Sequence, residues 1–502
     1  MGWYLQFNSL EFLFLFLPVA VFLFYFLGKK HRDLSLGWLT VISLIFYGWW
    51  NPSYLQLITV SILVNYFIGI GLQKLRSQAR ASLSVTFLST GILFNLLLLG
   101  YFKYANFFVN NLNALTGSSF HLGTIVLPLA ISFFTFQQIT FLVDSYKEDI
   151  SETDFLQYCA FVTFFPHLIA GPICRHKEVL PQFAENKIFT CDHERLSVGL
   201  TIFIIGLFKK VVLADGIAFY ATPVFDAAER AAHIGFFDAW GGALAYTFQL
   251  YFDFSGYSDM AIGVARMFGI LLPLNFNSPY KSTSIIEFWR NWHITLSRLL
   301  RDYLYFPLGG NRKGKLRGHA NLMLTMTLGG VWHGAGWTFV AWGALHGVYL
   351  VINHMWRDFR KTFLKERGDT GWWGKGAAQA LTFIAVVAAW VLFRAKSFDG
   401  AINLMQGMAG MHGFVLTKDF LAMQRGLIIL FTLVMWAPNT QQIMLSYAPT
   451  LESYYSDIKH YRWSFFKWEP SFIWFNIGLI VTIYSIYKVM VSGYEEFIYQ
   501  FF

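Results

Sequence analysis

The chain has 502 residues, of which 56% are hydrophobic, 19% aromatic and only 13% charged. A soluble protein carries about 25% charged residues, so this composition excludes an ordinary soluble domain. Charge-free runs recur from end to end, which predicts an all-α, multi-pass membrane protein with a single integral membrane domain over residues 1–502. The formal net charge of +9 is typical of basic cytoplasmic loops and does not indicate nucleic-acid binding.

The first apolar run, residues 12–27, is followed rather than preceded by positive charge, at Lys29, Lys30 and Arg32. A cleaved signal peptide has the opposite order, so we interpret this run as an uncleaved first span with a cytoplasmic C-terminal end. Because about 20 apolar residues suffice for one crossing, further runs predict about 11 crossings. These runs lie near residues 36–50, 53–73, 82–102, 125–143, 196–220, 236–272, 321–353, 376–393, 426–438 and 471–491.

Two segments between these runs have a different character. Residues 110–123 are rich in Asn, Ser and Gly and predict an external loop. Residues 155–177 are apolar, but Pro166 and Pro172 interrupt them, which favours a broken or re-entrant element packed against protein. The three cysteines form no CxxC pair and no zinc-like spacing, so they indicate neither a disulfide framework nor a metal site.

Residues 321–353 combine an apolar character with ionisable rings. These 33 residues contain no Asp, Glu, Lys or Arg, yet they include His333 and His346, each followed by a glycine. The stretch is long enough to cross a bilayer at least once. An imidazole at membrane depth is costly unless it faces protein or water, so it is a functional candidate. The competing interpretation is that either histidine only hydrogen-bonds a neighbouring helix.

The segment immediately upstream, residues 281–317, is strongly basic, with eight Lys or Arg residues against two acids. The charge bias of membrane proteins places it on the cytoplasmic face. Arg and Lys recognise phosphates, so this surface suits a phosphate-bearing acyl carrier such as coenzyme A. A basic loop that only sets the topology is the alternative. The candidate carrier-binding residues are Arg290, Arg298, Arg301, Arg312 and Lys313.

Acyl transfer needs a base that takes the proton of the attacking group, and donors that hold the developing oxyanion. The sequence contains no G-x-S-x-G nucleophile elbow, which leaves His333 as the leading candidate base. His293 is the second candidate and lies in residues 287–303, whose pattern predicts an amphipathic helical element. Asp253 and Asp259 lack the spacing of an EF-hand, so we expect structural carboxylates, each paired with a basic group.

Several longer motifs extend along nearly the whole chain. They include LPLAISFFTFQQITFLVD (127–144), FVTFFPHLIAGPI (161–173), GLFKKVVLAD (206–215), QLYFDFSGYSDMAIG (249–263), NFNSPY (275–280), EFWRNWHITLSRLLRDYLYFPLGGNR (287–312) and LGGVWHGAGWTFVAWGALHG (328–347). With these motifs the chain resembles the membrane-bound O-acyltransferase (MBOAT) superfamily, specifically its bacterial alginate O-acetylation branch. The block 249–347 is the most specific part of the resemblance.

The resemblance implies a ring of transmembrane helices with re-entrant elements, a central tunnel and a catalytic core over about residues 125–356. It implies that a cytoplasmic acyl donor, usually acetyl-CoA acting as a substrate, meets an acceptor arriving from outside, with no bound cofactor. The family's principal histidine corresponds to His333 in GGVWHG. Its second histidine corresponds to His293, with Thr295 where the family usually has serine.

The resemblance also implies partners and a location. A separate extracytoplasmic esterase-type transferase often completes the transfer to a secreted polysaccharide or a cell-wall glycan. Such a system is placed in the bacterial inner membrane, with the lipid bilayer around the enzyme and an acyl-CoA on its cytoplasmic side.

Three interpretations of function remain open from the sequence. The first is an O-acetyltransferase serving an extracytoplasmic polysaccharide such as alginate, with another exopolysaccharide or peptidoglycan as the alternative acceptor. The second is a transporter that uses intramembrane His and Asp as a proton relay. The lack of matching broken segments in the two halves argues against it. The third is an assembly subunit without chemistry of its own.

Overall fold

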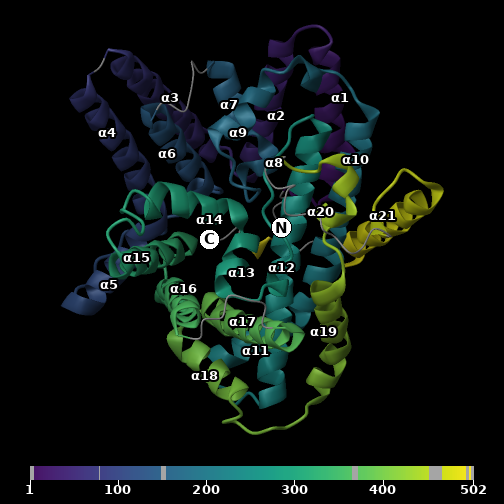
Figure 1. Ribbon diagram of the computed structural model, residues 1–502. Helices are drawn as coiled ribbons and strands as arrows, with labels where there is room; N and C mark the ends of the chain where they lie inside the picture. Colours follow the sequence, from purple (N-terminus) through teal and green to yellow (C-terminus); the bar gives the residue numbers. More distant parts are fainter. Residues whose placement is uncertain are drawn as a thin grey trace. The chain divides into compact units, whose positions relative to one another are not determined.

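The computed structural model describes residues 5–78, 80–147, 154–363, 371–451, 466–492 and 497–498, and the regular structure in these ranges is helical (Figure 1). The chain divides into two compact units. The first comprises residues 1–211, 256–274 and 440–502, and the second comprises residues 212–255 and 275–439. The helical architecture confirms the predicted fold class, and the two units are described in turn.

The first unit contains the N-terminal helices and the last helix of the chain. Its main helices are α1 (Leu17–Gly28), α2 (Arg32–Trp50), α3 (Ser53–Ser77), α4 (Ala81–Leu99), α5 (Ala105–Thr116), α6 (Ile131–Lys147), α7 (Phe155–Thr163), α8 (Phe165–Leu168), α9 (His176–Phe183), α10 (His193–Phe208), α20 (Thr440–Ile443) and α21 (Phe472–Ser492). Helix α1 packs on α2, and α3, α4 and α6 pack on one another (Figure 1).

Helices α3 and α4 are joined by a buried pair of amides. Asn65 and Asn95 each donate a side-chain N–H to the other's side-chain oxygen, at 3.3 and 2.6 Å. Both residues are fully buried. Interhelical amide bonds of this kind hold apolar helices together where a hydrophobic driving force is lacking, because lipid is as apolar as the helix surfaces.

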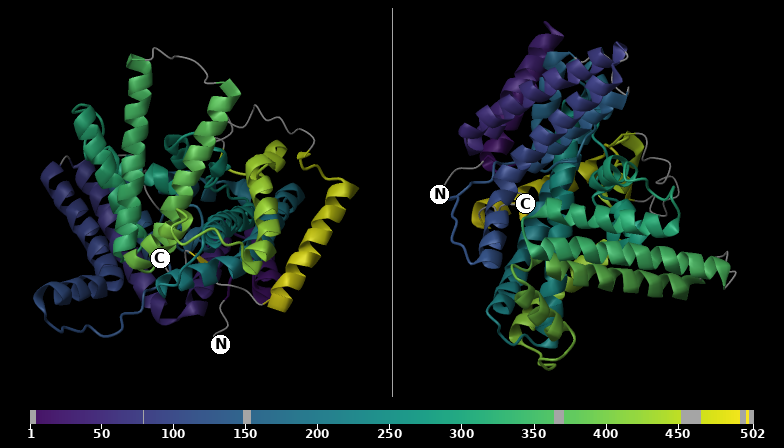
Figure 2. Two further views of the ribbon diagram at one scale, coloured as in Figure 1. Left: turned by 90° about the horizontal axis from the view of Figure 1, so that it is seen from below. Right: turned by 90° about the vertical axis from the view of Figure 1, so that its left-hand side faces the viewer.

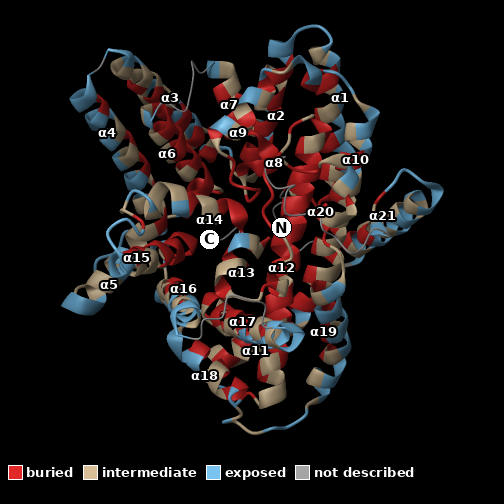
Figure 3. Cartoon of the chain, viewed as in Figure 1, coloured by how far each residue is buried: buried red, intermediate tan, exposed pale blue. Residues whose placement is uncertain are grey.

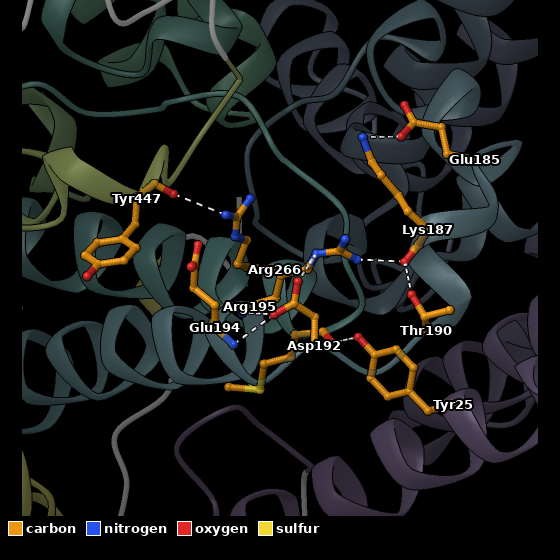
Figure 4. A network of polar contacts seen from close by, with 10 residues as sticks. Tyr25, Glu185, Lys187, Thr190, Asp192, Glu194, Arg195, Arg266 and Tyr447 are labelled. Carbon is orange, nitrogen blue, oxygen red and sulfur yellow. Dashed lines mark hydrogen bonds and ion pairs between the residues drawn. The ribbon is translucent and has the colours of Figure 1, made fainter. Parts of the chain in front are cut away.

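A polar network fixes the start of α10 (Figure 4). The Asp192 carboxylate caps α10 by accepting from backbone N–H groups of its first turn, which otherwise have no intrahelical partner. The guanidinium of Arg195 lies 3.2 Å from the same carboxylate and donates to the carbonyl oxygen of Lys187 at 2.8 Å. Nearby, the Tyr25 hydroxyl on α1 donates to the carbonyl oxygen of Met267. The contacts of Asp192 and Arg195 tie the loop before α10 to that helix, and the Tyr25 contact ties α1 to Met267.

The second unit contains the segment that the sequence singled out. Its helices are α11 (Asp215–Glu229), α13 (Ile285–Asn291), α14 (Ile294–Leu300), α15 (Lys315–His333), α16 (Trp337–Thr362), α17 (Gly371–Arg394), α18 (Phe398–Met408) and α19 (Lys418–Trp436). Helices α15, α16 and α17 lie side by side, as the two views of Figure 2 show. A π-helical turn, η6 (Arg301–Tyr305), extends α14.

Helix α12 (Phe236–Met267) has its first part in the second unit and its last part in the first. Residues 241–268 are buried on nearly every side, as the red ribbon of Figure 3 shows. A helix that is buried all round has no solvent face, so each polar group along it needs a partner inside the protein.

Helices α15 and α16 form a hairpin whose two arms touch through glycines. A Cβ atom added at Gly330 would lie 2.3 Å from the carbonyl oxygen of Phe339 and 3.0 Å from the Cα of Gly343. The absence of side chains at both glycines therefore permits the close approach of the two backbones. The hairpin divides the charge-free stretch 321–353, which is not one continuous helix, because the chain leaves the helical conformation at Gly334 and Gly336.

Within the described ranges, six helices are long and apolar enough to cross a membrane: Ser53–Ser77, Ala81–Thr116, His193–Glu229, Gly371–Arg394, Lys418–Trp436 and Phe472–Val491. A shorter apolar helix covers Phe12–Gly28. These helices bear out a multi-pass membrane protein. They do not confirm the predicted count of about 11 crossings, and neither α15 nor α16 is among them.

Two predicted segments can be compared directly with the structure. The break in residues 155–177 is confirmed, since Phe164 leaves the helical conformation between α7 and α8. The predicted external loop at 110–123 is helical as far as Thr116. The side chain of Asn111 is satisfied within this helix, since its Nδ2 donates to the Phe107 carbonyl oxygen at 2.7 Å, and Gly117 ends the helix at a φ of 69°.

Candidate active site

His333 is the last residue of α15, where the hairpin turns. Gly334 follows it, and a Cβ at that position would lie 2.2 Å from the ring of Phe339. Only a glycine leaves room for this ring, so the sequence GGVWHG both ends the helix and holds the imidazole at its end. The last carbonyl groups of a helix carry partial negative charge, and the imidazole of His333 lies at this end of α15.

The imidazole of His333 is enclosed by aromatic rings. It is 2% exposed, and its ring centre lies 4.9 Å from that of Trp332, 5.0 Å from that of Trp342 and 5.3 Å from that of Phe393. These rings come from three different helices, α15, α16 and α17. An apolar surround of this kind strengthens every electrostatic contact made inside it.

His293 lies at a sharp break between α13 and α14. The predicted amphipathic element at 287–303 is therefore helical but interrupted, because His293 adopts a left-handed conformation with a φ of 42° and a ψ of 54°. A non-glycine residue in this region is strained and persists only where the surroundings hold it in place. Such strain is concentrated at functional sites.

Asn275 is the residue that holds this break. Its side-chain oxygen lies 2.9 Å from Nδ1 of His293 and accepts a hydrogen bond of 2.9 Å from the Thr295 hydroxyl. Its backbone carbonyl accepts from the N–H of Ile294 at 3.0 Å. Asn275 and His293 are both fully buried. Sequence reasoning assigned no role to Asn275, although this residue begins the NFNSPY motif. The hydroxyl of Thr295, which stands where the family usually has serine, donates the hydrogen bond to Asn275.

The structure brings the two predicted histidines into one site through Trp332. The indole lies 4.9 Å from the ring of His333 and 6.4 Å from the ring of His293. The ring of His293 also packs on the ring of Phe254, with ring centres 4.8 Å apart and the two rings nearly perpendicular. Residues 40 positions apart in the sequence thus form one cluster.

The same cluster includes His346, which sequence reasoning noted as an intramembrane imidazole but did not assign to the site. Nε1 of Trp289 donates to Nδ1 of His346 at 3.2 Å, and the ring of His346 lies 5.0 Å from that of Trp342. Trp342 therefore contacts both His333 and His346. The signal in the sequence was the i, i+4 spacing of Trp342 and His346, which places both side chains on one face of α16.

The predicted carrier-binding residues lie outside this buried cluster. Arg301 makes a two-point contact with its neighbour Asp302, at 2.7 and 3.2 Å. Arg290 and Arg301 are exposed, as are Arg312 and Lys313 in the turn before α15, and Arg298 is partly exposed.

Basic groups also gather at the open end of the hairpin. Lys315 at the start of α15 forms an ion pair of 2.7 Å with Asp358 near the end of α16, and this hydrogen bond holds the pKa of Asp358 below its usual range. Asn353 on α16 accepts from the N–H of Ile286, which brings α13 and its Arg290 to the same end. Lys315 is 18 residues from His333, or about 27 Å along the helix. The charges and the histidine therefore lie at opposite ends of α15.

The sequence matches the family described as "MBOAT, membrane-bound O-acyltransferase family" over residues 44–393. The chain belongs to this family. It is 42% identical to the peptidoglycan O-acetyltransferase of Helicobacter pylori over 479 residues, which is 88% of each chain. It is 45% identical to a probable alginate O-acetylase, AlgI, of Pseudomonas putida over 80% of each chain. A teichoic acid D-alanyltransferase of Streptococcus thermophilus is 30% identical over 53% of this chain and 68% of its own length.

Membership of the family makes this protein an acyltransferase of the membrane-bound type. The interpretation as an acyltransferase therefore stands, in place of the transporter and of the assembly subunit without chemistry of its own. The resemblance seen in the motifs is confirmed, including the similarity to the alginate O-acetylation branch.

The buried carboxylate of Asp259 has a structural partner in this acyltransferase, as expected. Its Oδ2 lies 2.6 Å from Nζ of Lys209 and accepts a hydrogen bond of 2.6 Å from the Thr440 hydroxyl. The neighbouring Lys210 lines a small cavity of about 20 Å³, room for roughly one water molecule. The expected basic partner of Asp253 stays a prediction.

Proposed function

We propose that this acyltransferase moves an acetyl group from acetyl-CoA across the membrane for O-acetylation of an extracytoplasmic polysaccharide, with His333 as the general base and His293 as the second histidine of the site. The observation that carries the proposal is the position of Trp332, whose indole contacts both imidazoles. Imidazole is the side chain that most often serves as the general acid or base in such a transfer.

The step follows from the groups present. The acceptor hydroxyl gives its proton to the imidazole of His333, and its oxygen forms a bond to the carbonyl carbon of the thioester. The carbonyl oxygen carries the negative charge until the carbon–sulfur bond breaks, and the thiolate takes the proton back from the imidazolium. The C-terminal end of α15 stabilises that imidazolium through the partial negative charge of its carbonyl groups.

The donor is assigned to the cytoplasmic side because the exposed charges there match its phosphates. Arg290, Arg298, Arg301, Arg312 and Lys313 would hold a phosphorylated carrier, as arginine forks and lysine ammonium groups do elsewhere. The catalytic core would then cover about residues 125–356, which include both histidines and the whole basic segment.

Alginate is the first candidate acceptor, on the strength of the relatives named as alginate O-acetylases. Peptidoglycan is the second, because the relative with that acceptor in its name matches 88% of the chain. In either case the acetyl group would pass from the inner membrane to an extracytoplasmic esterase-type transferase, which completes the transfer to the glycan.

The test is acyl transfer by the purified protein in lipid nanodiscs with an alginate oligosaccharide or a peptidoglycan fragment as the acceptor, measured as loss of label from radioactive acetyl-CoA. His333→Ala and His333→Gln should each abolish this loss while the protein accumulates normally. His319→Ala is the matched control, because His319 lies on the same helix about 21 Å from His333. Transfer at the normal rate by His333→Ala would overturn the assignment of the base. In cells, the acetyl content of alginate and of peptidoglycan in the His333→Ala strain identifies the acceptor.

A further inference from the structure

Two hydrogen-bond donors next to His333 are buried without an acceptor. The indole N–H of Trp342 and Nε2 of His346 have no hydrogen-bond partner among the described residues. Trp342 is 1% exposed and His346 is fully buried. Buried donors are normally satisfied, because leaving one unpaired costs the full penalty of removing it from water. Two such groups in neighbouring side chains therefore indicate a missing acceptor.

The bond from Trp289 fixes which form of His346 is present. An indole N–H can only donate, so Nδ1 of His346 must accept and cannot carry a proton. The neutral ring then has its proton on Nε2, the atom that has no protein partner. His346 is therefore held as a hydrogen-bond donor and is unsuited to act as a base.

The other tryptophans that surround His346 provide a contrast. Trp289 donates to His346 at 3.2 Å, and Trp390 donates to the hydroxyl of Tyr280 at 3.1 Å. Trp390 stacks on Trp342 with ring centres 5.7 Å apart, so the two indoles share their surroundings. The indole N–H groups of Trp289 and Trp390 therefore have acceptors, whereas that of Trp342 between them has none among the described residues.

The two donors also share a location. Trp342 and His346 are one helical turn apart on α16, and their ring centres are separated by 5.0 Å. Trp342 lies equally close, at 5.0 Å, to the ring of His333. An acceptor bound between these rings would lie beside the candidate base.

The geometry points to Nε1–H of Trp342 and Nε2–H of His346 as the donors that hold the carbonyl oxygen of the transferred acyl group. This inference rests on the proposed function, and it assigns the binding site of the acyl thioester carbonyl. As the acceptor oxygen bonds to the carbonyl carbon, the carbonyl π electrons move to its oxygen and form the oxyanion that the two N–H groups stabilise. The proton of the acceptor goes to His333, and the charge returns to expel the thiolate.

The prediction is tested with Trp342→Phe and His346→Phe, each of which removes one donor and keeps an aromatic ring. Each should lower kcat by about a hundredfold with little change in the KM for acetyl-CoA, because the lost bond strengthens only as charge develops. His346→Gln retains an N–H donor and should recover part of the rate. Trp390→Phe is the matched control, since it removes an indole whose N–H is already paired, and its kcat should stay near the wild-type value.

A spectroscopic measurement separates this role from a structural one. Acetonyl-CoA keeps the carbonyl but cannot transfer its acyl group, and its ¹³C-labelled carbonyl stretch should shift to lower frequency when it binds the wild-type protein. The shift should be smaller in Trp342→Phe and in His346→Phe and unchanged in Trp390→Phe. An unshifted carbonyl in the wild-type protein would refute the inference, as would normal kcat in both Phe variants.

The outcome is distinguishable from failure of the proposed function. If His333→Ala is inactive while both Phe variants transfer acetyl groups normally, His333 keeps its role and the carbonyl-binding assignment is wrong. If His333→Ala is fully active, the proposed base is wrong whatever the Phe variants do.

Discussion

Nδ1 of His293 lies 2.9 Å from the side-chain oxygen of Asn275, a residue 18 positions earlier in the chain. The same oxygen accepts from the Thr295 hydroxyl, and the backbone of Asn275 accepts from the residue after His293. One asparagine therefore holds the left-handed turn at His293 and orients the imidazole. The left-handed conformation of His293 persists because these hydrogen bonds hold the turn in place.

Asn275→Ala should lower the stability of the protein by about 2 kcal/mol, because it leaves two buried polar groups without their acceptor. Acetyl transfer should fall with it, since the ring of His293 is no longer oriented. Thermal unfolding in detergent and label transfer from acetyl-CoA measure the two effects.

Thr295 supplies the matched pair for this measurement. Thr295→Ser keeps the hydroxyl and should behave like the wild-type protein, whereas Thr295→Val should show part of the Asn275→Ala defect. Equal behaviour of the two Thr295 variants would show that the hydroxyl plays no part.

Removal of the carboxylate from the buried pair of Lys209 and Asp259 should be strongly destabilising. Asp259→Ala leaves a buried ammonium group without its partner, which costs about 3–5 kcal/mol. The double variant Lys209→Met with Asp259→Leu should regain more than half of that loss, because it buries no charge. Thermal unfolding of the single and double variants checks this expectation, and a double variant as unstable as Asp259→Ala would contradict it.

Gly330→Ala should disrupt the α15–α16 hairpin. The new methyl group would lie 2.3 Å from a backbone oxygen that has no freedom to move aside, so the helices must separate and His333 must shift. We expect at least a tenfold loss of acetyl transfer and a lower unfolding temperature. Gly376→Ala on α17 meets no atom within 4 Å and should be as active and as stable as the wild-type protein.

The exposed charges should affect donor binding and not the chemical step. The double variant Arg312→Ala with Lys313→Ala should raise the KM for acetyl-CoA about tenfold and leave kcat unchanged, because it removes uniform binding to the phosphates. The effect should shrink as the salt concentration rises, since exposed charges are screened. An unchanged KM for acetyl-CoA at low salt would show that these two residues do not bind the donor.

Local patterns singled out the candidate site residues, because each pattern depends on a short stretch of sequence. The charge-free stretch around His333 marked that histidine before any contact was known. The break at residues 155–177 followed from two prolines. The hairpin within 321–353 did not follow from local patterns, because it depends on the packing of Gly330 against Gly343. The helix over residues 110–116 was missed because asparagines in such a run are typical of loops.

By itself, the sequence determined the class of the protein, its helical membrane-spanning character and the candidate histidines, because composition, apolar run length and motifs are local properties. Only the tertiary structure decided which polar groups meet. The contact of Trp332 with two histidines 40 residues apart, and the bond from Trp289 to a histidine 57 residues away, exist because separate helices pack together. Pairings of this kind leave no periodic signature in the chain, since their partners are set by packing and not by spacing.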